Sequence, residues 1–512
     1  MKRAPSALLF LLLTGHLPAQ TILVAPYVQP GNGSTLSGTD VKVLTWLTDR
    51  TAREFTVEFR ADAGAWNTAR PVVTPLDFGV PKVKPAPAPK PGANPLANAP
   101  TTLDEAKRDA EASTSPALPE KEQHFLRYAA ELPGLPFDGA IEYRVTSRAQ
   151  VIREGKFKTR ASATKPVRFV AVGDMTNGKP EQNAIAWQIA QQKPDFMIAL
   201  GDIVYSSGRA SQYLHHFWPT YNDVQTAGPT TGAPLLASVP LYPVLGNHDL
   251  TSALPGDYPD AWAAFHFFDV PRNGPGRGPW TPVASKKPAE TAEFEKLAGA
   301  QFPSMLNYSW DCGPVHFVAL DSNKQVTAEE PALLEWIGKD LGTTRQPWKV
   351  VCFHAPAFHT SREHYTEQKM RLLQPLFERT GVDIVFCGHV HNYQRTKPLR
   401  FKQTEPRDKR GRITGEFQLD STFDGVKDTT PEGVVHIVSG GGGAKLYSVD
   451  YANTVAALKK EQGSNYVPFT AKYYAEKHSF SLVEASMTAF TVRQINIDGA
   501  EVDRFTITKP AR

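Results

Sequence analysis

Short apolar runs alternate with helix-like segments through the last two-thirds of this chain, and this alternation limits the fold more than any other feature. Runs with the length and composition of buried strands occur at 167–172, 196–200, 316–320, 349–353, 384–387 and 434–438. Helix-like segments lie between them at 182–192, 333–341 and 370–379. Such alternation is typical of layered α/β domains. We therefore predict an α/β domain over residues 166–512, with strand-like runs between 480 and 505 closing the sheet.

The region from residue 21 to about residue 160 has a different pattern, in which short β-like runs are separated by turn residues. These runs lie at 41–46, 55–59, 125–128 and 141–145. Strands at this spacing predict an all-β sandwich. A Pro/Ala-rich stretch at about 75–122 interrupts the pattern, and we interpret it as an exposed insertion without chemistry.

Residues 1–19 have the pattern of an export signal. Lys2 and Arg3 precede an apolar run at 7–13, and the small residue Ala19 stands at the expected cleavage point. The apolar run is too short to cross a bilayer, and no later stretch of ~18 apolar residues follows it. We expect a secreted or periplasmic protein with no membrane span after cleavage, and an uncleaved anchor is the alternative that stays open.

The composition excludes several classes of protein. Hydrophobic residues make up 41% of the chain and charged residues 21%, which fits neither a disordered chain nor a membrane-embedded one. A net charge of +4 over 512 residues gives no case for a nucleic-acid-binding surface. Cys312, Cys352 and Cys387 are the only cysteines. Although export permits disulfides, two of the three lie in apolar runs, so we expect buried free thiols.

Residues of metal-ligating type follow five of the predicted strands, at the point where each strand ends. In open α/β sheets, the carboxyl ends of the strands border the ligand crevice. Each motif alone is weak evidence, because Gly-Asp and Gly-His pairs are common in turns. Ordinary turn sequences do not account for five strands that are each apolar to their end and are each followed by a residue of metal-ligating type. The motifs are Gly173-Asp174, Gly201-Asp202-Ile203-Val204-Tyr205, Gly246-Asn247-His248-Asp249, Val351-Cys352-Phe353-His354 and Gly388-His389-Val390-His391.

The order of these motifs and the residues in them resemble those of the purple acid phosphatases, a branch of the calcineurin-like metallophosphoesterases. The resemblance covers about residues 166–443, and the preceding region, which opens with the sequence Ala-Pro-Tyr-Val-Gln at 25–29, is similar to the fibronectin-type domain of that family. It implies a layered β-sandwich flanked by helices, preceded by an Ig/fibronectin-like sandwich. Relatives without a purple centre usually have Asp-x-His in the first motif. This chain has Asp174-Met175-Thr176 there and Tyr205 in the second motif, so it resembles the Tyr-using branch.

Carried over to this sequence, the resemblance implies two metal sites that share one bridging carboxylate. One ion would be held by Asp174, Asp202, Tyr205 and His391, and the other by Asp202, Asn247, His354 and His389. Carboxylate and phenolate are hard anionic ligands that suit ferric iron, whereas two imidazoles and an amide suit a divalent ion. We therefore expect Fe³⁺ in the first site and Zn²⁺, Mn²⁺ or Fe²⁺ in the second.

The resemblance also implies which residues act on the substrate. The motif of His248 places it at the mouth of the site, where it would bind phosphate or act as a general acid. A His-His pair usually follows the fourth motif in this family. Here His364 matches the second member, Glu363 departs from the first, and His359 is an additional candidate. This departure leaves the assignment on the leaving-group side open.

The expected function is that of an acid phosphatase-type hydrolase acting on a small-molecule phosphate monoester. Metal-activated water would attack the phosphorus, so no protein nucleophile is needed. Two alternatives stay open: a phosphodiesterase or nucleotide-cleaving enzyme on the same metal centre, and a non-enzymatic surface binding protein. The glycine run at 440–443 lacks the Gly-Lys-Ser/Thr ending of a P-loop, so we predict a tight turn beside the metal crevice.

Overall fold

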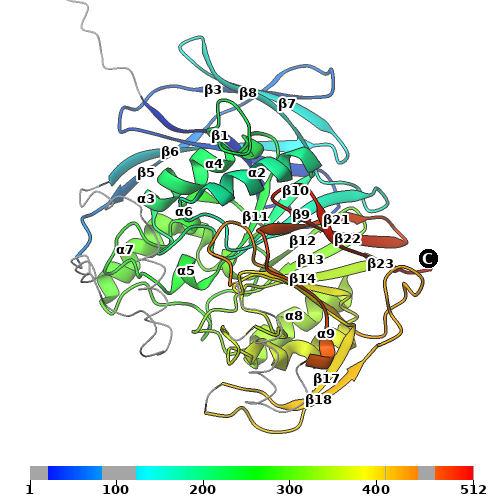
Figure 1. The fold of residues 1–512 in the computed structure, drawn as a ribbon. Coiled ribbons are helices and arrows are strands. Elements are labelled where there is room, and N and C mark those ends of the chain that lie inside the picture. The colour runs from blue at the N-terminus through cyan, green and yellow to red at the C-terminus, as the bar shows by residue number, and fades with distance from the viewer. Residues whose placement is uncertain (1–20, 83–122, 362, 410, 448–466, 511–512) are drawn as a thin grey trace, which may run out of the picture.

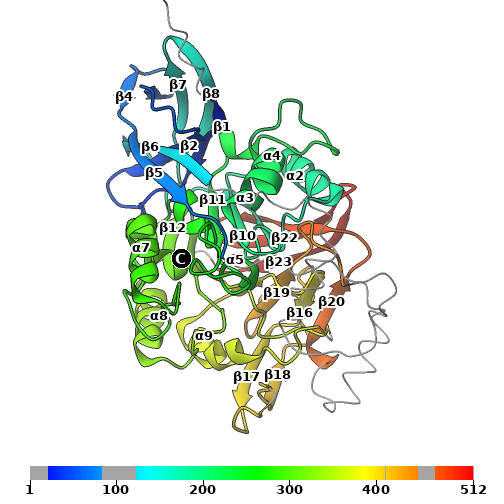
Figure 2. The ribbon, with the colours of Figure 1, turned by 90° about the vertical axis from the view of Figure 1, so that its left-hand side faces the viewer.

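The computed structural model describes residues 21–82, 123–361, 363–409, 411–447 and 467–510, and Figure 1 and Figure 2 show it in two perpendicular views. The predicted export signal and most of the Pro/Ala-rich stretch lie outside these residues. In both views an N-terminal β domain sits against one end of a larger α/β domain. Within the described ranges, no helix combines the length and the apolar character that crossing a membrane requires. Cys312, Cys352 and Cys387 are buried free thiols, as predicted.

The N-terminal domain is a sandwich of two four-stranded sheets, with strand orders β1-β2-β6-β5 and β4-β3-β7-β8. In β7, alternate residues face the core, and Ile141, Tyr143 and Val145 are buried, as in a strand with one face on a core. The strands are β1 (Ile22–Gln29), β2 (Asp40–Thr48), β3 (Thr56–Ala61), β4 (Asn67–Ala69), β5 (Val72–Phe78), β6 (Gln123–Leu135), β7 (Ala140–Ser147) and β8 (Gln150–Lys158). All four predicted strand runs fall within or largely within these elements.

The predicted start of the insertion, at about residue 75, is too early. Strand β5 continues to Phe78, which lies opposite Gln123 of β6. Leu76 and Phe78 are buried, so the strand still contributes to the core after Pro75. Proline is tolerated there because β5 is an edge strand, where a missing N–H costs no ladder hydrogen bond. Residues 83–122 of the predicted insertion lie outside the described residues.

The predicted α/β domain is confirmed, and its first strand is β9 (Val167–Val172). It contains a six-stranded sheet, β11-β10-β9-β21-β22-β23, and a seven-stranded sheet, β12-β13-β14-β15-β19-β16-β20. The sheets pack face to face, because the Phe317 ring of the second lies 5.1 Å from Phe169 and 5.5 Å from Phe196 of the first. Helix α2 packs on the first sheet, and α8 and α9 pack on the second (Figure 1). Helices therefore flank a β-sandwich.

The other strands of this domain are β10 (Phe196–Leu200), β11 (Leu241–Val244), β12 (Tyr308–Cys312), β13 (Val315–Ala319), β14 (Trp348–Cys352), β15 (Ile384–Cys387), β16 (Tyr393–Thr396), β17 (Leu399–Gln403), β18 (Gly415–Leu419), β19 (Val435–Ser439), β20 (Thr470–Tyr474), β21 (Ser479–Ala485), β22 (Ala489–Asn496) and β23 (Glu501–Thr508). The helices are α2 (Pro180–Gln192), α3 (Ala210–Gln212), α4 (Trp218–Tyr221), α5 (Asn247–Leu250), α6 (Ala264–Phe267), α7 (Pro288–Ala298), α8 (Pro331–Thr343) and α9 (Gln374–Thr380). Short 3₁₀ turns occur at Leu235–Ala237, Gly299–Gln301, Ser304–Leu306, Lys369–Leu373 and Val467–Phe469, and a π-helical turn at Tyr213–Phe217.

The strand directions bring the five sequence motifs to one edge of the sandwich. Strands β9, β10 and β11 are parallel to one another, and so are β13, β14, β15 and β19. Parallel strands present their carboxyl ends at a common edge. The motifs follow β9, β10, β11, β14 and β15, and the glycine run at 440–443 follows β19. The edge that carries them is the place to look for a functional site.

A buried histidine joins helix α8 to the β12–β13 hairpin and gives a prediction about pH. His316 Nδ1 lies 2.7 Å from Asp311 Oδ1, and its Nε2 lies 2.8 Å from Asp340 Oδ2. Burial alone would lower the pKa of His316, but hydrogen bonds to the two aspartates raise it to about 9. This group therefore stabilises the fold fully below about pH 6.5, the pKa of unfolded histidine, and the stabilisation is lost as pH rises through about 9.

We expect His316→Gln to unfold more easily than wild type at pH 6, with the difference shrinking by about 3 kcal/mol by pH 10. Urea unfolding at the two pH values measures this change. The exposed His215 provides the control, because His215→Gln should follow the wild-type pH dependence. Equal pH profiles for wild type and His316→Gln would contradict the assignment.

Candidate metal centre

The loops at this edge hold three candidate ligands in an unusual backbone conformation. Asp174, Asp202 and His389 have φ values of 60°, 51° and 68°, in the left-handed region that non-glycine residues seldom adopt. Such strain persists only where surrounding contacts impose it, and it concentrates at functional sites. The contacts here include the His389 N–H, which donates to Asp174 Oδ2 at 2.8 Å.

Close packing requires glycine in the motifs that follow β10 and β11. A Cβ added at Gly246 would lie 2.1 Å from Asp202 Oδ1, and one added at Gly201 would lie 2.3 Å from His354 Nδ1. These contacts are too short for any side chain, so glycine allows the loops to approach the polar cluster. Asp249 joins two of the loops, because its carboxylate accepts hydrogen bonds from the Ile203 and Gly246 N–H groups at 3.1 and 2.9 Å.

The four residues proposed for the first metal converge on one point. Tyr205 Oη lies 2.9 Å from Asp174 Oδ1, 3.1 Å from Asp202 Oδ2 and 3.0 Å from His391 Nε2. His391 Nε2 is also 3.3 Å from Asp174 Oδ1. All four side chains are buried. Two carboxylates, a phenol and an imidazole therefore face one another without intervening protein atoms.

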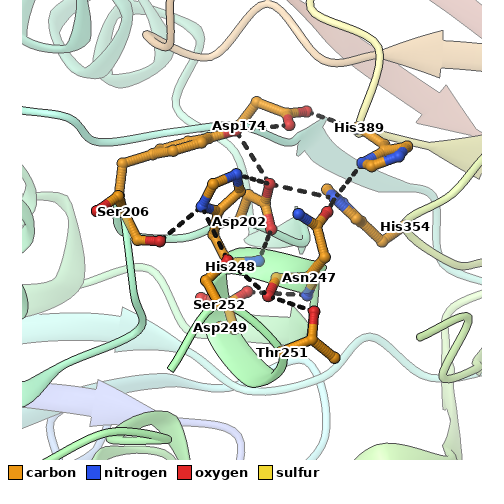
Figure 3. A network of polar contacts seen from close by, with 12 residues as sticks. Asp174, Asp202, Ser206, Asn247, His248, Asp249, Thr251, Ser252, His354 and His389 are labelled. Carbon is orange, nitrogen blue, oxygen red and sulfur yellow. Dashed lines mark hydrogen bonds and ion pairs between the residues drawn. The ribbon is translucent and has the colours of Figure 1, made fainter. Parts of the chain in front are cut away.

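The four residues proposed for the second metal converge beside the first group. His354 Nε2 lies 3.1 Å from Asn247 Oδ1, 3.3 Å from Asp202 Oδ2 and 3.1 Å from His389 Nδ1. Figure 3 shows Asp202 between His248 and His354, with Asn247 and His389 alongside. Asp202 Oδ2 contacts both groups, which is the position a bridging carboxylate would take.

Outer contacts fix which nitrogen of each imidazole faces the cluster. His354 Nδ1 donates to the Leu200 carbonyl at 2.7 Å, and His391 Nδ1 donates to the Lys445 carbonyl at 2.7 Å. His389 is turned the other way, with Nε2 lying 3.2 Å from Glu367 Oε2. Metal-ligating histidines commonly use their second nitrogen in this way. Each ring thus presents one nitrogen inward.

The electrostatics of the cluster suit a bound cation. Burial alone would lower the pKa of His354, but the Asp202 carboxylate raises it to about 10. Burial alone would raise the pKa of Asp202, but the His354 charge holds it well below its usual range. Burial and repulsion from His364 lower the pKa of His389 to about 4, so its inward nitrogen has a free lone pair. A cation would meet ionised carboxylates and the lone pair of His389, and it would displace the proton that His354 carries in its absence.

His248 and His364 lie at the same cavity as the converging ligands. The His248 ring lies against Tyr205, with ring centroids 4.4 Å apart, and its Nδ1 is 2.6 Å from the Ser206 carbonyl oxygen. This contact leaves Nε2, 3.9 Å from Asp202 Oδ2, facing the cluster. The His364 ring lies 3.8 Å from that of His389.

Two residues that the sequence did not single out complete this wall. Glu367 bridges His364 Nδ1 at 3.1 Å and His389 Nε2 at 3.2 Å. Tyr447 stacks on His391, with ring centroids 4.2 Å apart, and its hydroxyl lies 3.0 Å from His364 Nε2. Glu367 could have been noted from the sequence, because it is a carboxylate three residues after the candidate His364. Apart from the glycine run at 440–443, nothing in the sequence around Tyr447 points to the site, because it is 83 residues from His364.

The structure does not bring His359 to the cavity. Its side chain is buried, neither ring nitrogen has a hydrogen-bond partner among the described residues, and the ring lies 5.7 Å from that of Tyr365. Burial lowers the pKa of His359 to about 3, so the ring is neutral. The catalytic role predicted for His359 therefore has no geometric support. Glu363, which departs from the family's histidine, is also absent from the cavity wall.

A cavity of about 630 Å³ opens over the cluster, within the ~300–1,000 Å³ range of small-ligand sites. The metal side of its wall includes Asp202, Asn247, His354, His389 and His391. The glycine run after β19 closes the base of the site, because a Cβ at Gly440 would lie 2.7 Å from Asp174 Oδ2. The tight turn predicted there is thus beside the cluster.

Comparison with known proteins shows that this chain is similar to phosphoesterases. Residues 167–393 match the family model of the Calcineurin-like phosphoesterases. Purple acid phosphatase 21 of Arabidopsis thaliana is 40% identical over 20% of this chain and 24% of its own length. The Nucleotide pyrophosphatase/phosphodiesterase of Hordeum vulgare is 28% identical over 62% of this chain and 73% of its own. The solved structure of purple acid phosphatase PPD1 from yellow lupin (Lupinus luteus) seeds shares the fold, with a TM-score of 0.59 at 19% identity over 94% of this chain and 74% of that one.

Proposed function

We propose that this chain is a secreted two-metal phosphatase acting on phosphate monoesters. Residues 167–393 match the Calcineurin-like phosphoesterase family model, and part of the chain is similar to a purple acid phosphatase. The observation that carries the proposal is the convergence of seven side chains from five strand ends into two adjacent groups. Asp202 Oδ2 joins the groups, because it lies 3.1 Å from Tyr205 Oη and 3.3 Å from His354 Nε2. Secretion rests on the sequence pattern of residues 1–19.

The residues fit two ions of different kinds. Asp174, Asp202, Tyr205 and His391 would hold Fe³⁺, and Asp202, Asn247, His354 and His389 would hold Zn²⁺, Mn²⁺ or Fe²⁺. Two such ions, when bound, lower the pKa of water and neutralise charge on the phosphoryl oxygens. The donor sets support this division, because the first contains a phenol and two carboxylates and the second is dominated by neutral nitrogen and amide donors.

The chain's own residues would bind and protonate the substrate. His248 lies on the cavity wall with Nε2 facing the cluster. Because its Nδ1–H donates to the Ser206 carbonyl, Nε2 would donate to a phosphoryl oxygen in the imidazolium form. His364, held between Glu367 and Tyr447, would give a proton to the departing alkoxide oxygen. Removal of such a donor typically costs about 10²-fold or more in rate.

A phosphodiesterase or nucleotide-cleaving activity is the second candidate. It is favoured by the name of the barley relative, a Nucleotide pyrophosphatase/phosphodiesterase that aligns over 62% of this chain. The same ligands would serve either reaction. The turnover of phenyl phosphate, a monoester, relative to that of diphenyl phosphate, a diester, separates the two activities.

The experiment that tests the proposal measures metal content and turnover on one preparation. Protein purified without chelators should contain close to two metal ions per chain and hydrolyse monoesters. Chelation should remove activity, and adding iron with zinc or manganese should restore it. Metal-loaded protein without turnover of any mono- or diester would leave only the binding-protein alternative.

We expect His248→Ala to keep both metals and to lower kcat by about 10²-fold or more. Metal content by mass spectrometry and steady-state kinetics measure the two effects. The exposed His215 again provides the control, because His215→Ala should change neither. Loss of metal with a normal rate per bound metal would make His248 a ligand-positioning residue instead.

A further inference from the structure

Besides the metal ligands, the cavity wall carries four cations. They are Lys324, Lys369, Arg407 and Lys409, and the wall also carries the carboxylates Glu329 and Glu367. In the part of the chain that the structure describes, no salt bridge involves any of these four cations. Cations that line one cavity wall and outnumber the carboxylates beside them raise the local concentration of anions.

Three separate loops contribute these cations, and hydrogen bonds tie the loops together. Lys369 Nζ donates to the carbonyl oxygens of Asn323 and Val326, the latter at 2.9 Å, which joins its segment to the loop that carries Lys324. Burial lowers the pKa of Lys369 to about 8, the charges of Asp321 and Glu367 oppose this lowering, and the charge of Arg407 adds to it. Lys369 therefore lies within electrostatic range of Arg407 and of two carboxylates.

The loop between β17 and β18 is anchored to the same segment. The Ile413 N–H donates to Gln368 Oε1 at 2.8 Å, and Arg371 Nη1 donates to the Ile413 carbonyl at 3.1 Å. A Cβ at Gly411 would lie 2.7 Å from the Thr366 carbonyl oxygen, so this loop packs tightly against the segment that carries His364. Arg407 and Lys409 are exposed residues of this anchored loop, and both line the cavity.

We propose that this wall binds a second phosphoryl group of the substrate, so that the preferred substrates are esters with two or more phosphates. This inference rests on the proposed function, because one phosphate must occupy the metal side. Arg407 suits the role, since a guanidinium binds phosphate oxygens in pairs. A cavity of about 630 Å³ has room for an organic group between the two phosphates.

The test compares butyl phosphate with butane-1,4-diyl bisphosphate on the metal-loaded full chain. For wild type, we expect kcat/KM to favour the bisphosphate by about tenfold or more, beyond the factor of about two that its two equivalent groups supply. The preference should weaken as salt rises, because exposed charges are screened beyond about 10 Å at 0.1 M ionic strength.

The double variant R407Q/K409Q should lower the preference to about the statistical factor. The matched control is Lys402→Gln, because Lys402 lies exposed on β17 of the same hairpin and does not line the cavity. An equal preference in wild type and R407Q/K409Q, an equal loss in Lys402→Gln, or a wild-type preference no larger than the statistical factor would each overturn the inference.

Binding of non-hydrolysable analogues separates this inference from the proposed function. Butane-1,4-bisphosphonate should bind the metal-loaded wild type about tenfold more tightly than butylphosphonate, and R407Q/K409Q should abolish the difference. If no ester is hydrolysed but this difference appears, the proposed function fails and the second anion site stands. If esters are hydrolysed without either difference, the second anion site fails alone.

Discussion

Asp202→Asn is expected to lose both metal ions and all measurable turnover. Asp202 Oδ2 lies 3.1 Å from Tyr205 Oη and 3.3 Å from His354 Nε2, so one oxygen faces both candidate sites. An amide keeps the shape of the side chain but removes the negative charge that would hold two cations together. Metal analysis and monoester kinetics on the same preparation measure the effect, and His389→Ala should lose the second ion and turnover.

The matched control is Asp257→Asn, because Asp257 is an exposed aspartate of the same domain outside the cavity wall. It should retain metal and activity. Circular dichroism and thermal melting should show that Asp202→Asn still folds, since the cores of the two sheets do not depend on this carboxylate. Two bound metals with a normal rate in Asp202→Asn would refute the bridging role and the assignment of the centre.

The proposed ligand set was accessible from the sequence because it follows strand ends. Each of Asp174, Asp202, His354 and His389 comes one or two residues after an apolar run, and parallel strands bring such positions to one edge. The glycines in the motifs carry information for the same reason, because only glycine fits where the loops approach the cluster. Local pattern and three-dimensional position coincide at these residues.

Residues placed by long-range packing were not accessible in this way. Tyr447 reaches the site because the segment after β19 turns back over His391, and no periodicity near Tyr447 reports that path. His359 shows the opposite error: its residue type suits catalysis, but it follows the buried residues Ala357 and Phe358 into the core. In the N-terminal domain, Pro75 concealed strand β5, because proline is compatible with an edge strand.

The cationic wall was equally hidden in the sequence. Lys324, Lys369 and Arg407 are separated by tens of residues and lie in three loops, and a net charge of +4 gives no sign that they gather. Only the hydrogen bonds between those loops reveal a common surface. If the proposed second anion site exists, substrate preference depends on the part of the cavity that the family motifs do not cover.

Tyr205→Phe is expected to remove the colour of the iron-loaded protein while leaving iron bound. Tyr205 Oη lies 2.9 Å from Asp174 Oδ1 and 3.0 Å from His391 Nε2, in the position of a metal ligand. A free phenol has a pKa of about 10, so a phenolate at neutral pH requires a strongly Lewis-acidic partner, and a trivalent hard ion suits it better than Zn²⁺ or Mn²⁺.

A phenolate bound to ferric iron gives a visible charge-transfer absorption, which the wild-type protein loaded with iron should show. In Tyr205→Phe, Asp174, Asp202 and His391 remain to hold the ion, so iron content should stay near the wild-type value while the band disappears. Tyr258→Phe is the control, because Tyr258 is a partly buried tyrosine outside the cavity wall and should keep the colour. Colourless wild-type protein with a full complement of iron would show that Tyr205 only packs beside the site. Colourless wild-type protein that binds another metal in place of iron would overturn the assignment of Fe³⁺ to this group of ligands.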